Sequence, residues 1–125
     1  MDHDFVRAVC GKLPHTTEQV QWGSNLVFKV GGKMYAVTSL EPSAVCLSFK
    51  CTPEDFAALT ELPGIIPAPY LARAQWVALE SEDALPAAEI KRCLKQSYDL
   101  VFAKLTKKQQ AELAGAPSKP ARKKR

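Results

Sequence analysis

The chain has 125 residues, of which 46% are hydrophobic and 24% are charged. This length is enough for one domain with its own core and too short for two ordinary domains. No apolar run is long enough to cross a bilayer, and the first residues, Met-Asp-His-Asp, lack the basic and apolar regions of a secretory signal. We therefore expect a cytoplasmic protein without membrane contact.

The formal net charge of +4 is unevenly distributed. Residues 115–125 carry five of the seventeen basic side chains and no acidic one, which leaves twelve basic against thirteen acidic residues in 1–114, a charge of −1. The segment 115–125 also has two prolines and no large apolar side chain, so it cannot bury enough surface to fold. We interpret residues 1–114 as a single domain and residues 115–125 as a disordered basic tail.

The cysteines favour buried thiols over a disulfide framework or a zinc site, because none of them forms a Cys-x-x-Cys pair. They are Cys10, Cys46, Cys51 and Cys93. Lys50 precedes Cys51 and would lower the pKa of its thiol if both were exposed, whereas alternation with Phe49 favours a buried, inert thiol. Both interpretations remain open from the sequence.

Enzymatic readings have little support in the sequence. The histidines are His3 and His15, and neither has the spacing to a serine or cysteine that would indicate an activated nucleophile. We expect no enzyme, no catalytic residue and no cofactor.

Residues 2–12 predict an amphipathic helix that ends before Pro14. Phe5, Val9 and Leu13 recur at intervals of four, and acidic residues in the first turn suit the positive end of a helix. Residues 18–22 alternate weakly between polar and apolar and predict a short strand that Gly23 closes.

The strongest local signal is a hairpin over residues 26–36. Apolar residues alternate on both sides of Gly31 and Gly32, which can adopt the positive φ that tight hairpin turns require. Lys29 and Lys33 flank this turn, and we expect their ammonium groups to approach a polyanion together. The second arm continues through residues 37–40.

The elements after the hairpin complete a meander and then add helices. Residues 44–50 predict a strand with Val45, Leu47 and Phe49 on one face. Thr52 is expected to cap a helix that runs to about residue 62, with Pro53 at its first position.

Three prolines in residues 63–69 argue against regular structure there, and residues 75–79 predict another strand. Residues 86–105 carry a broad apolar stripe at helical spacing, and Thr106 resembles the N-cap of a last short helix. The sequence thus predicts an α+β fold in which an antiparallel sheet of about five strands has N- and C-terminal helices on one face. Its order is helix, strand, meander, helix, strand, helix.

Six motifs occur in a fixed order along residues 2–105: Trp22-Gly23, residues 28–35, residues 47–51, residues 63–70, Trp76-Val77 and residues 97–101. In this order they resemble the MmcQ/YjbR family of small bacterial proteins. The resemblance implies an α+β fold like that of the frataxin-related (CyaY-like) proteins and DNA binding with hairpins as wings. It implies no catalytic residues.

The chain departs from the family pattern after Tyr70. Family members commonly have a histidine and an asparagine or a lysine-rich segment there, whereas this chain reads Leu-Ala-Arg-Ala. Arg73 is therefore the single positive group between Tyr70 and Trp76.

We predict weak, largely sequence-independent contact of a monomer with the backbone of double-stranded DNA, made by the hairpin wing and the tail. Tyr35, Tyr70 and Trp76 would offer aromatic surface. The predicted nucleic-acid-binding residues are Lys29, Lys33, Lys50, Arg73, Lys119, Arg122, Lys123, Lys124 and Arg125. The alternative is that the lysines guard strand edges against aggregation and that the aromatic residues belong to the core.

Two other functions remain open. One is a protein- or peptide-interaction module that uses the loop at residues 63–70 and the sheet edge, with Ile65, Ile66, Tyr70 and Trp76 as contacts. The other is an acidic site for iron or another hard cation, by analogy with the frataxin-like fold, although helix starts and loops already explain these residues. Its candidates are Glu54, Asp55, Glu80, Glu82 and Asp83. Lys91, Arg92 and Lys95 are interpreted as a solvated helix face.

Overall fold

The computed structural model describes residues 2–69 and 71–114. In chain order the elements are α1 (His3–Gly11), β1 (Thr17–Gln21), β2 (Asn25–Val30), β3 (Lys33–Ser39), β4 (Leu47–Lys50), α2 (Pro53–Leu59), β5 (Ile65–Pro67), the 3-10 helix η1 (Ala72–Ala74), β6 (Trp76–Leu79), α3 (Ala87–Ala103) and α4 (Lys107–Ala114). No helix in these ranges is long and apolar enough to cross a membrane.

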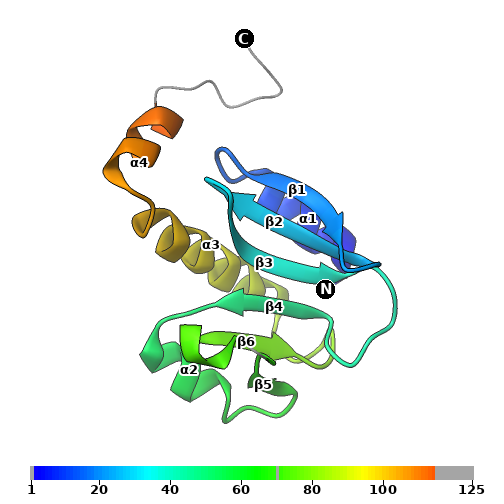
Figure 1. The fold of residues 1–125 in the computed structure, drawn as a ribbon. Helices are drawn as coiled ribbons and strands as arrows, with labels where there is room; N and C mark the ends of the chain where they lie inside the picture. Colours follow the sequence, from blue (N-terminus) through cyan, green and yellow to red (C-terminus); the bar gives the residue numbers. More distant parts are fainter. Residues whose placement is uncertain (1, 70, 115–125) are drawn as a thin grey trace.

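The strands form one antiparallel sheet in the order β1-β2-β3-β4-β6-β5 (Figure 1). Helix α3 packs on β2, β3 and β4, and α1 packs on β3 and α3, so both helices cover the same face. Helix α2 lies beside β5 and β6, at the end of the sheet away from β1, and its Phe56 and Leu59 pack into the same core as α1 and α3. The predicted α+β class and its order of elements are confirmed.

Two local predictions were wrong. Residues 65–67 form β5, an edge strand in which Pro67 pairs with Val77, because an edge strand needs hydrogen bonds on one side only and tolerates a missing N–H. The sheet therefore has six strands where about five were expected. Val45 lies before β4 and packs on the face opposite to Leu47 and Phe49.

Side-chain caps start three of the helices. Asp2, expected as a first-turn acid, is itself the cap of α1 and accepts a hydrogen bond of 2.9 Å from the Phe5 N–H. Thr52 Oγ1 accepts from the Asp55 N–H at 3.1 Å, and Thr106 Oγ1 accepts from the Gln109 N–H at 3.1 Å. The predicted N-caps at Thr52 and Thr106 are confirmed, since each hydroxyl satisfies an N–H that the helix itself leaves free.

The main core lies between the sheet and helices α1 and α3, and a smaller apolar cluster lies on the opposite face. Alternation along β6 divides its residues between the two, with Val77 and Leu79 in the main core and Trp76 and Ala78 on the other face. The smaller cluster consists of Ala68, Trp76 and Ala78, packed by Met34, Val37, Val45, Ile66 and Leu71. Both faces of the central strands are therefore at least partly covered.

A β-bulge interrupts the hairpin between β2 and β3. Phe28 pairs with Ala36 and Lys29 pairs with Met34, so Tyr35 is an extra residue on β3. Tyr35 and Ala36 consequently both reach the main core. A regular alternation of side chains along the strand would place these two consecutive residues on opposite faces of the sheet.

Tyr35 and Tyr98 anchor the segment between α1 and β1 to the core. Their rings meet edge to face at 5.4 Å between centroids. The Tyr35 hydroxyl lies 2.9 Å from Thr16 Oγ1, and the Tyr98 hydroxyl donates to the Pro14 carbonyl at 2.6 Å. Both tyrosines therefore have structural roles.

Strands β3 and β4 separate beyond the pair Ala36–Phe49, and Ser97 of α3 fills the polar gap. Its Oγ accepts a hydrogen bond from the Lys50 N–H at 2.9 Å and donates one to the Tyr35 carbonyl at 2.6 Å. Ser97 is fully buried. A single hydroxyl thus replaces a direct bond between the two strands and satisfies both backbone groups.

We expect Ser97→Ala to destabilise the fold by about 2–3 kcal/mol, because it leaves a buried N–H and a buried C=O without a partner. Urea unfolding followed by circular dichroism measures the change. Ser48→Ala on the half-buried side of β4 is the matched control and should change the free energy of unfolding by less than about 1 kcal/mol. Equal effects of the two substitutions would refute the bridging role of Ser97.

Candidate nucleic-acid interface

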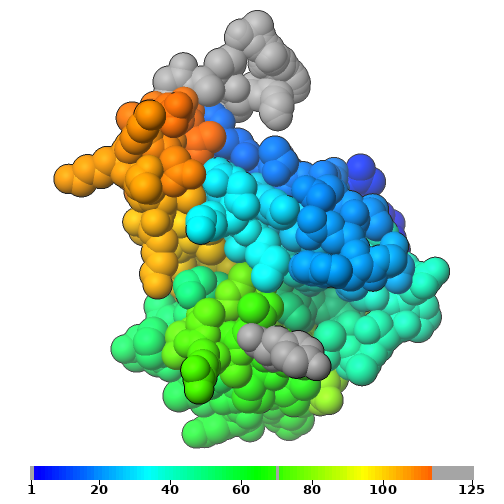
Figure 2. All heavy atoms as spheres, viewed as in Figure 1, coloured from blue at the N-terminus to red at the C-terminus, as the bar shows by residue number. Residues whose placement is uncertain are grey.

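A pocket of about 420 Å³ opens where β3 and β4 separate. Three lysines and three apolar side chains line it, and no acidic residue does. The lining residues are Lys33, Met34, Lys50, Trp76, Val101 and Lys104. We call these six residues the lysine pocket. Figure 2 shows the cyan hairpin and the yellow-orange end of α3 meeting at this part of the surface.

The position of the hairpin depends on Gly31. This residue has a φ of 60°, and a methyl group added to it would lie 2.6 Å from Leu105 Cδ1. The turn therefore packs directly on the buried Leu105, which follows α3. This contact brings Lys33, at the start of β3, into the same pocket as Lys104.

Lys29 and Lys33 do not lie on the same face of the hairpin. Lys33 is opposite Val30, which lies in the main core, whereas Lys29 is opposite Met34, which packs on the other face. Opposed residues of an antiparallel pair share a face. The register therefore places Lys29 and Lys33 on opposite faces of the hairpin, and Lys33 alone lines the pocket.

Lys50 is held in place by the loop before β6. Its Nζ donates a hydrogen bond of 2.6 Å to the Ala74 carbonyl. Gln75, the next residue, adopts a left-handed conformation with a φ of 66°. Burial, followed by the charge of Lys104, lowers the pKa of Lys50 below its ordinary value. An anion in the pocket would offset both effects.

Lys104 is the pocket residue that sequence reasoning missed. No local pattern relates Lys104 to the hairpin, and the contact of Gly31 with Leu105 that brings the end of α3 beside the hairpin is not visible in the sequence. The Gln110 side chain donates to the carbonyls of Phe102 and Leu105, each at 3.1 Å. These carbonyls are thereby satisfied at the negative end of α3.

The other predicted contacts lie outside the pocket. Arg73 is exposed in η1, one residue before the carbonyl that binds Lys50. The Tyr35 ring belongs to the core. Tyr70 and the basic residues of the tail lie outside the described residues. The basic residues of the tail are Lys119, Arg122, Lys123, Lys124 and Arg125.

The alternative peptide surface is largely buried. Ile65 is 2% exposed in the main core and Trp76 is 4% exposed, while Ile66 is half-buried on the opposite face. The expectation of an exposed loop around these isoleucines was wrong, because β5 pairs with β6 and turns them to opposite sides of the sheet. By contrast, Trp22 is 66% exposed in the turn before β2.

The opposite ends of the strands form an acidic cleft, which has a volume of about 440 Å³. Ser39 at the end of β3 and Glu80 directly after β6 belong to it, whereas the lysine pocket contains the starts of β3 and β6. The acidic residues that line this cleft are Asp2, Glu41, Glu80 and Glu82, and His3 also lines it. The strands therefore run between an acidic end and a basic end.

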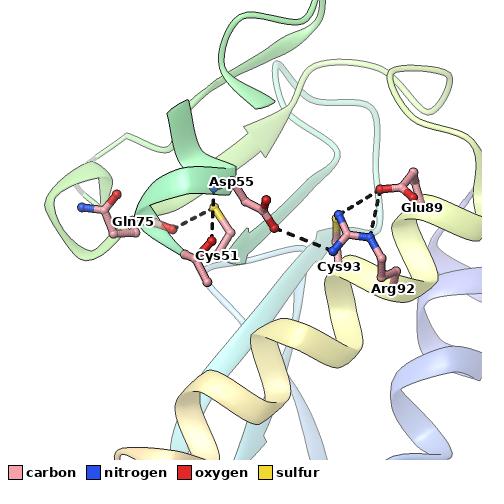
Figure 3. A network of polar contacts seen from close by, with 7 residues as sticks. Cys51, Asp55, Gln75, Glu89, Arg92 and Cys93 are labelled. Carbon is pink, nitrogen blue, oxygen red and sulfur yellow. Dashed lines mark hydrogen bonds and ion pairs between the residues drawn. The ribbon is translucent and has the colours of Figure 1, made fainter. Parts of the chain in front are cut away.

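The remaining acidic candidates have ordinary partners or positions. Arg92 bridges α3 to α2 through Asp55 at 3.7 Å and also binds Glu89 at 2.9 Å (Figure 3). Glu54 lies in the first turn of α2. Within residues 2–69 and 71–114, no group of three histidine, cysteine or acidic residues could hold a metal ion.

The helix lysines and the thiols fit structural roles. Lys95 pairs with Asp99 at 2.8 Å one turn along α3, which supports the interpretation of a solvated face. All four cysteines are free. Burial raises the pKa of Cys51 to about 11 and that of Cys93 to about 11. The buried-thiol interpretation of Cys51 is confirmed, and its Sγ donates to the Gln75 carbonyl at 3.4 Å.

Comparisons with known proteins agree on the family. The family model described as YjbR matches residues 11–100. A crystal structure of a Deinococcus radiodurans protein with a DUF419 domain is similar at 34% identity and a TM-score of 0.81, covering 94% of this chain and 91% of that one. No curated protein matches the chain.

A second solved structure supports the fold alone. It is a Pseudomonas syringae protein that is 23% identical, with a TM-score of 0.67 over 80% of this chain and 98% of that one.

We expect Gly31→Ala to be more destabilising than Gly32→Ala. Both positions have positive φ, at 60° and 81°, and each substitution should cost about 1–2 kcal/mol for that reason. Only an alanine at position 31 collides with Leu105, because nothing lies within 4 Å of a methyl group at position 32, so a further cost of about 1–3 kcal/mol is expected there. Urea unfolding midpoints of the two variants measure the difference, and equal midpoints would contradict the docking contact.

We expect Cys46 to be the most reactive thiol toward Ellman's reagent at neutral pH, since it is half-buried while Cys10, Cys51 and Cys93 are buried. Burial raises the pKa of Cys10 to about 12, so its thiolate is scarce at pH 8, as are those of the other two buried cysteines. In denaturant all four thiols should react together. Rapid reaction of Cys51 in the folded protein would show that its thiol is open to solvent.

Proposed function

The chain belongs to the YjbR family, and on this premise we propose that it binds double-stranded DNA weakly and without sequence preference, through the phosphate backbone. The observation that carries the proposal is the convergence of Lys33, Lys50 and Lys104 on one pocket without an acidic neighbour in its lining. Ammonium groups without a carboxylate partner are free to neutralise phosphate. The same arrangement offers no group placed to read base edges.

The separation of basic and acidic residues between the two ends of the strands supports DNA contact at the lysine pocket. Although residues 1–114 have a net charge of −1, the lysine pocket and the acidic cleft occupy opposite strand ends. The field of such a molecule directs a polyanion toward the basic end and away from the acidic end. A near-neutral domain can therefore present a local binding surface.

The basic tail enters the proposal through its charge. It follows α4 in the chain and adds five positive groups without an acidic one. Each phosphate that it neutralises would increase the salt dependence of binding. Arg73 beside the pocket and Lys29 on the other face of the hairpin are proposed as peripheral contacts.

The peptide-interaction alternative keeps only part of its surface. Ile66 remains half-exposed on the sheet edge, whereas Ile65 is needed by the core.

We further propose a cytoplasmic location and a monomeric binding unit. Four free thiols support that location, since reducing conditions maintain them.

We expect a short fluorescent duplex to bind in an anisotropy titration at low ionic strength and to be released steeply as salt is added. The double variant Lys33→Glu/Lys50→Glu should weaken binding and lower the magnitude of the salt slope by about two. Removal of residues 116–125 should lower it further, because five charges are lost.

The matched control is Lys12→Glu/Lys91→Glu, which changes the net charge equally at exposed positions just after α1 and on α3. Both residues line a second pocket, in which the third lysine, Lys95, is already paired with Asp99 at 2.8 Å. It should retain most of the affinity. Thermal unfolding of each variant checks that the fold persists. The proposal fails if no duplex binds at low ionic strength, or if the control loses as much affinity as the pocket variant.

A further inference from the structure

We propose that the lysine pocket binds a phosphate monoester together with the organic group attached to it, either the 5′-phosphorylated end of a DNA strand or a free nucleotide. For the strand end, this inference rests on the proposed function; for the free nucleotide it stands on the pocket alone. Three features of the pocket support it: its shape, its charge and its rigidity.

The shape favours a small ligand over the side of a duplex. The pocket has a volume of about 420 Å³, within the range of small-molecule sites. The backbone of a duplex runs along the outside of a convex cylinder, so an internal phosphate meets the ammonium groups at the rim of such a pocket and fills little of its volume. A terminal phosphate or a free nucleotide has no such restriction.

The charge favours a monoester over a diester. Lys33, Lys50 and Lys104 bring three positive groups to one cavity. An internal phosphodiester carries one negative charge, whereas a phosphate monoester carries between about 1.5 and 2 at neutral pH. The doubly charged group therefore compensates more of the repulsion among the lysines.

The apolar lining provides a wall for the attached group. Met34, Trp76 and Val101 contribute carbon surface beside the ammonium groups. Because Trp76 is 4% exposed, it offers an edge and no open face on which a base could stack. The pocket is therefore expected to recognise the phosphate and to accept different bases.

The backbone around the pocket is already ordered without a ligand. Lys50 is held at its backbone by Ser97, at 2.9 Å, and at its Nζ by the Ala74 carbonyl, at 2.6 Å. The packing of Gly31 on Leu105 fixes the hairpin that carries Lys33. A ligand consequently does not need to order these segments when it binds.

The first test uses AMP and adenosine as probes, with amide chemical shifts followed by two-dimensional NMR at low salt. AMP should shift the amides around Lys33, Lys50 and Lys104, and adenosine should leave them unchanged. Lys50→Glu/Lys104→Glu should weaken AMP binding about tenfold or more, since charged contacts are lost. Lys104→Gln, which neutralises one exposed side chain, is the milder variant if the double variant does not fold. Lys12→Glu/Lys91→Glu should bind AMP as the unaltered protein does.

The second test compares duplexes of one sequence with 5′-phosphate or 5′-hydroxyl ends. The phosphorylated duplex should bind severalfold more tightly, and AMP should remove that advantage. AMP binding without any duplex binding would support the inference for a free nucleotide and refute the proposed function. Equal binding of both duplexes without AMP binding would refute the inference and leave the proposed function intact. Equal binding of adenosine and AMP, or AMP binding that the pocket variants do not change, would also overturn the inference.

Discussion

The hydroxyl of Ser97 is the contact on which the lysine pocket depends. Strands β3 and β4 diverge before Ala36 on β3 and after Phe49 on β4, and divergence in a buried region normally leaves backbone groups without partners. Ser97 accepts from Lys50 and donates to Tyr35, so one side chain of α3 satisfies both strands. The sheet can therefore open at this point without the cost of an unsatisfied N–H or C=O. A pocket forms beside the helix where a continuous sheet would have closed it.

The glycine turn has a second role beyond reversing the chain. Gly31 provides the left-handed backbone of the hairpin and leaves room for Leu105, so the hairpin lies against the end of α3. Lys33, Lys50 and Lys104 then meet although they come from three elements. The acidic residues collect at the other strand ends, and net charge alone conceals this separation. Local geometry explains how a nearly neutral domain can present a basic site.

The errors of sequence reasoning have common physical causes. Pro67 was read as a breaker of regular structure, although an edge strand leaves one side of its backbone unpaired and accepts proline there. Lys29 and Lys33 were expected to approach a polyanion together, but the two-residue turn pairs Val30 with Lys33 and Lys29 with Met34, which assigns each lysine to a different face. Trp22 is 66% exposed in the turn after the edge strand β1, where no neighbouring strand covers it on one side.

The sequence by itself determined the helices, the strands other than β5, their order and the α+β class. The stripe of α3, the caps at Thr52 and Thr106 and the glycine turn are local patterns, and local patterns depend on residues a few positions apart. Only the tertiary structure decided which lysines share a pocket. That outcome rests on the register of β2 and β3, on the bridge from Ser97 and on the packing of Gly31 against Leu105. Each of these contacts joins residues that are far apart in the sequence. The pattern of apolar residues does not indicate which distant residues meet, because packing and hydrogen bonding in the folded chain decide it.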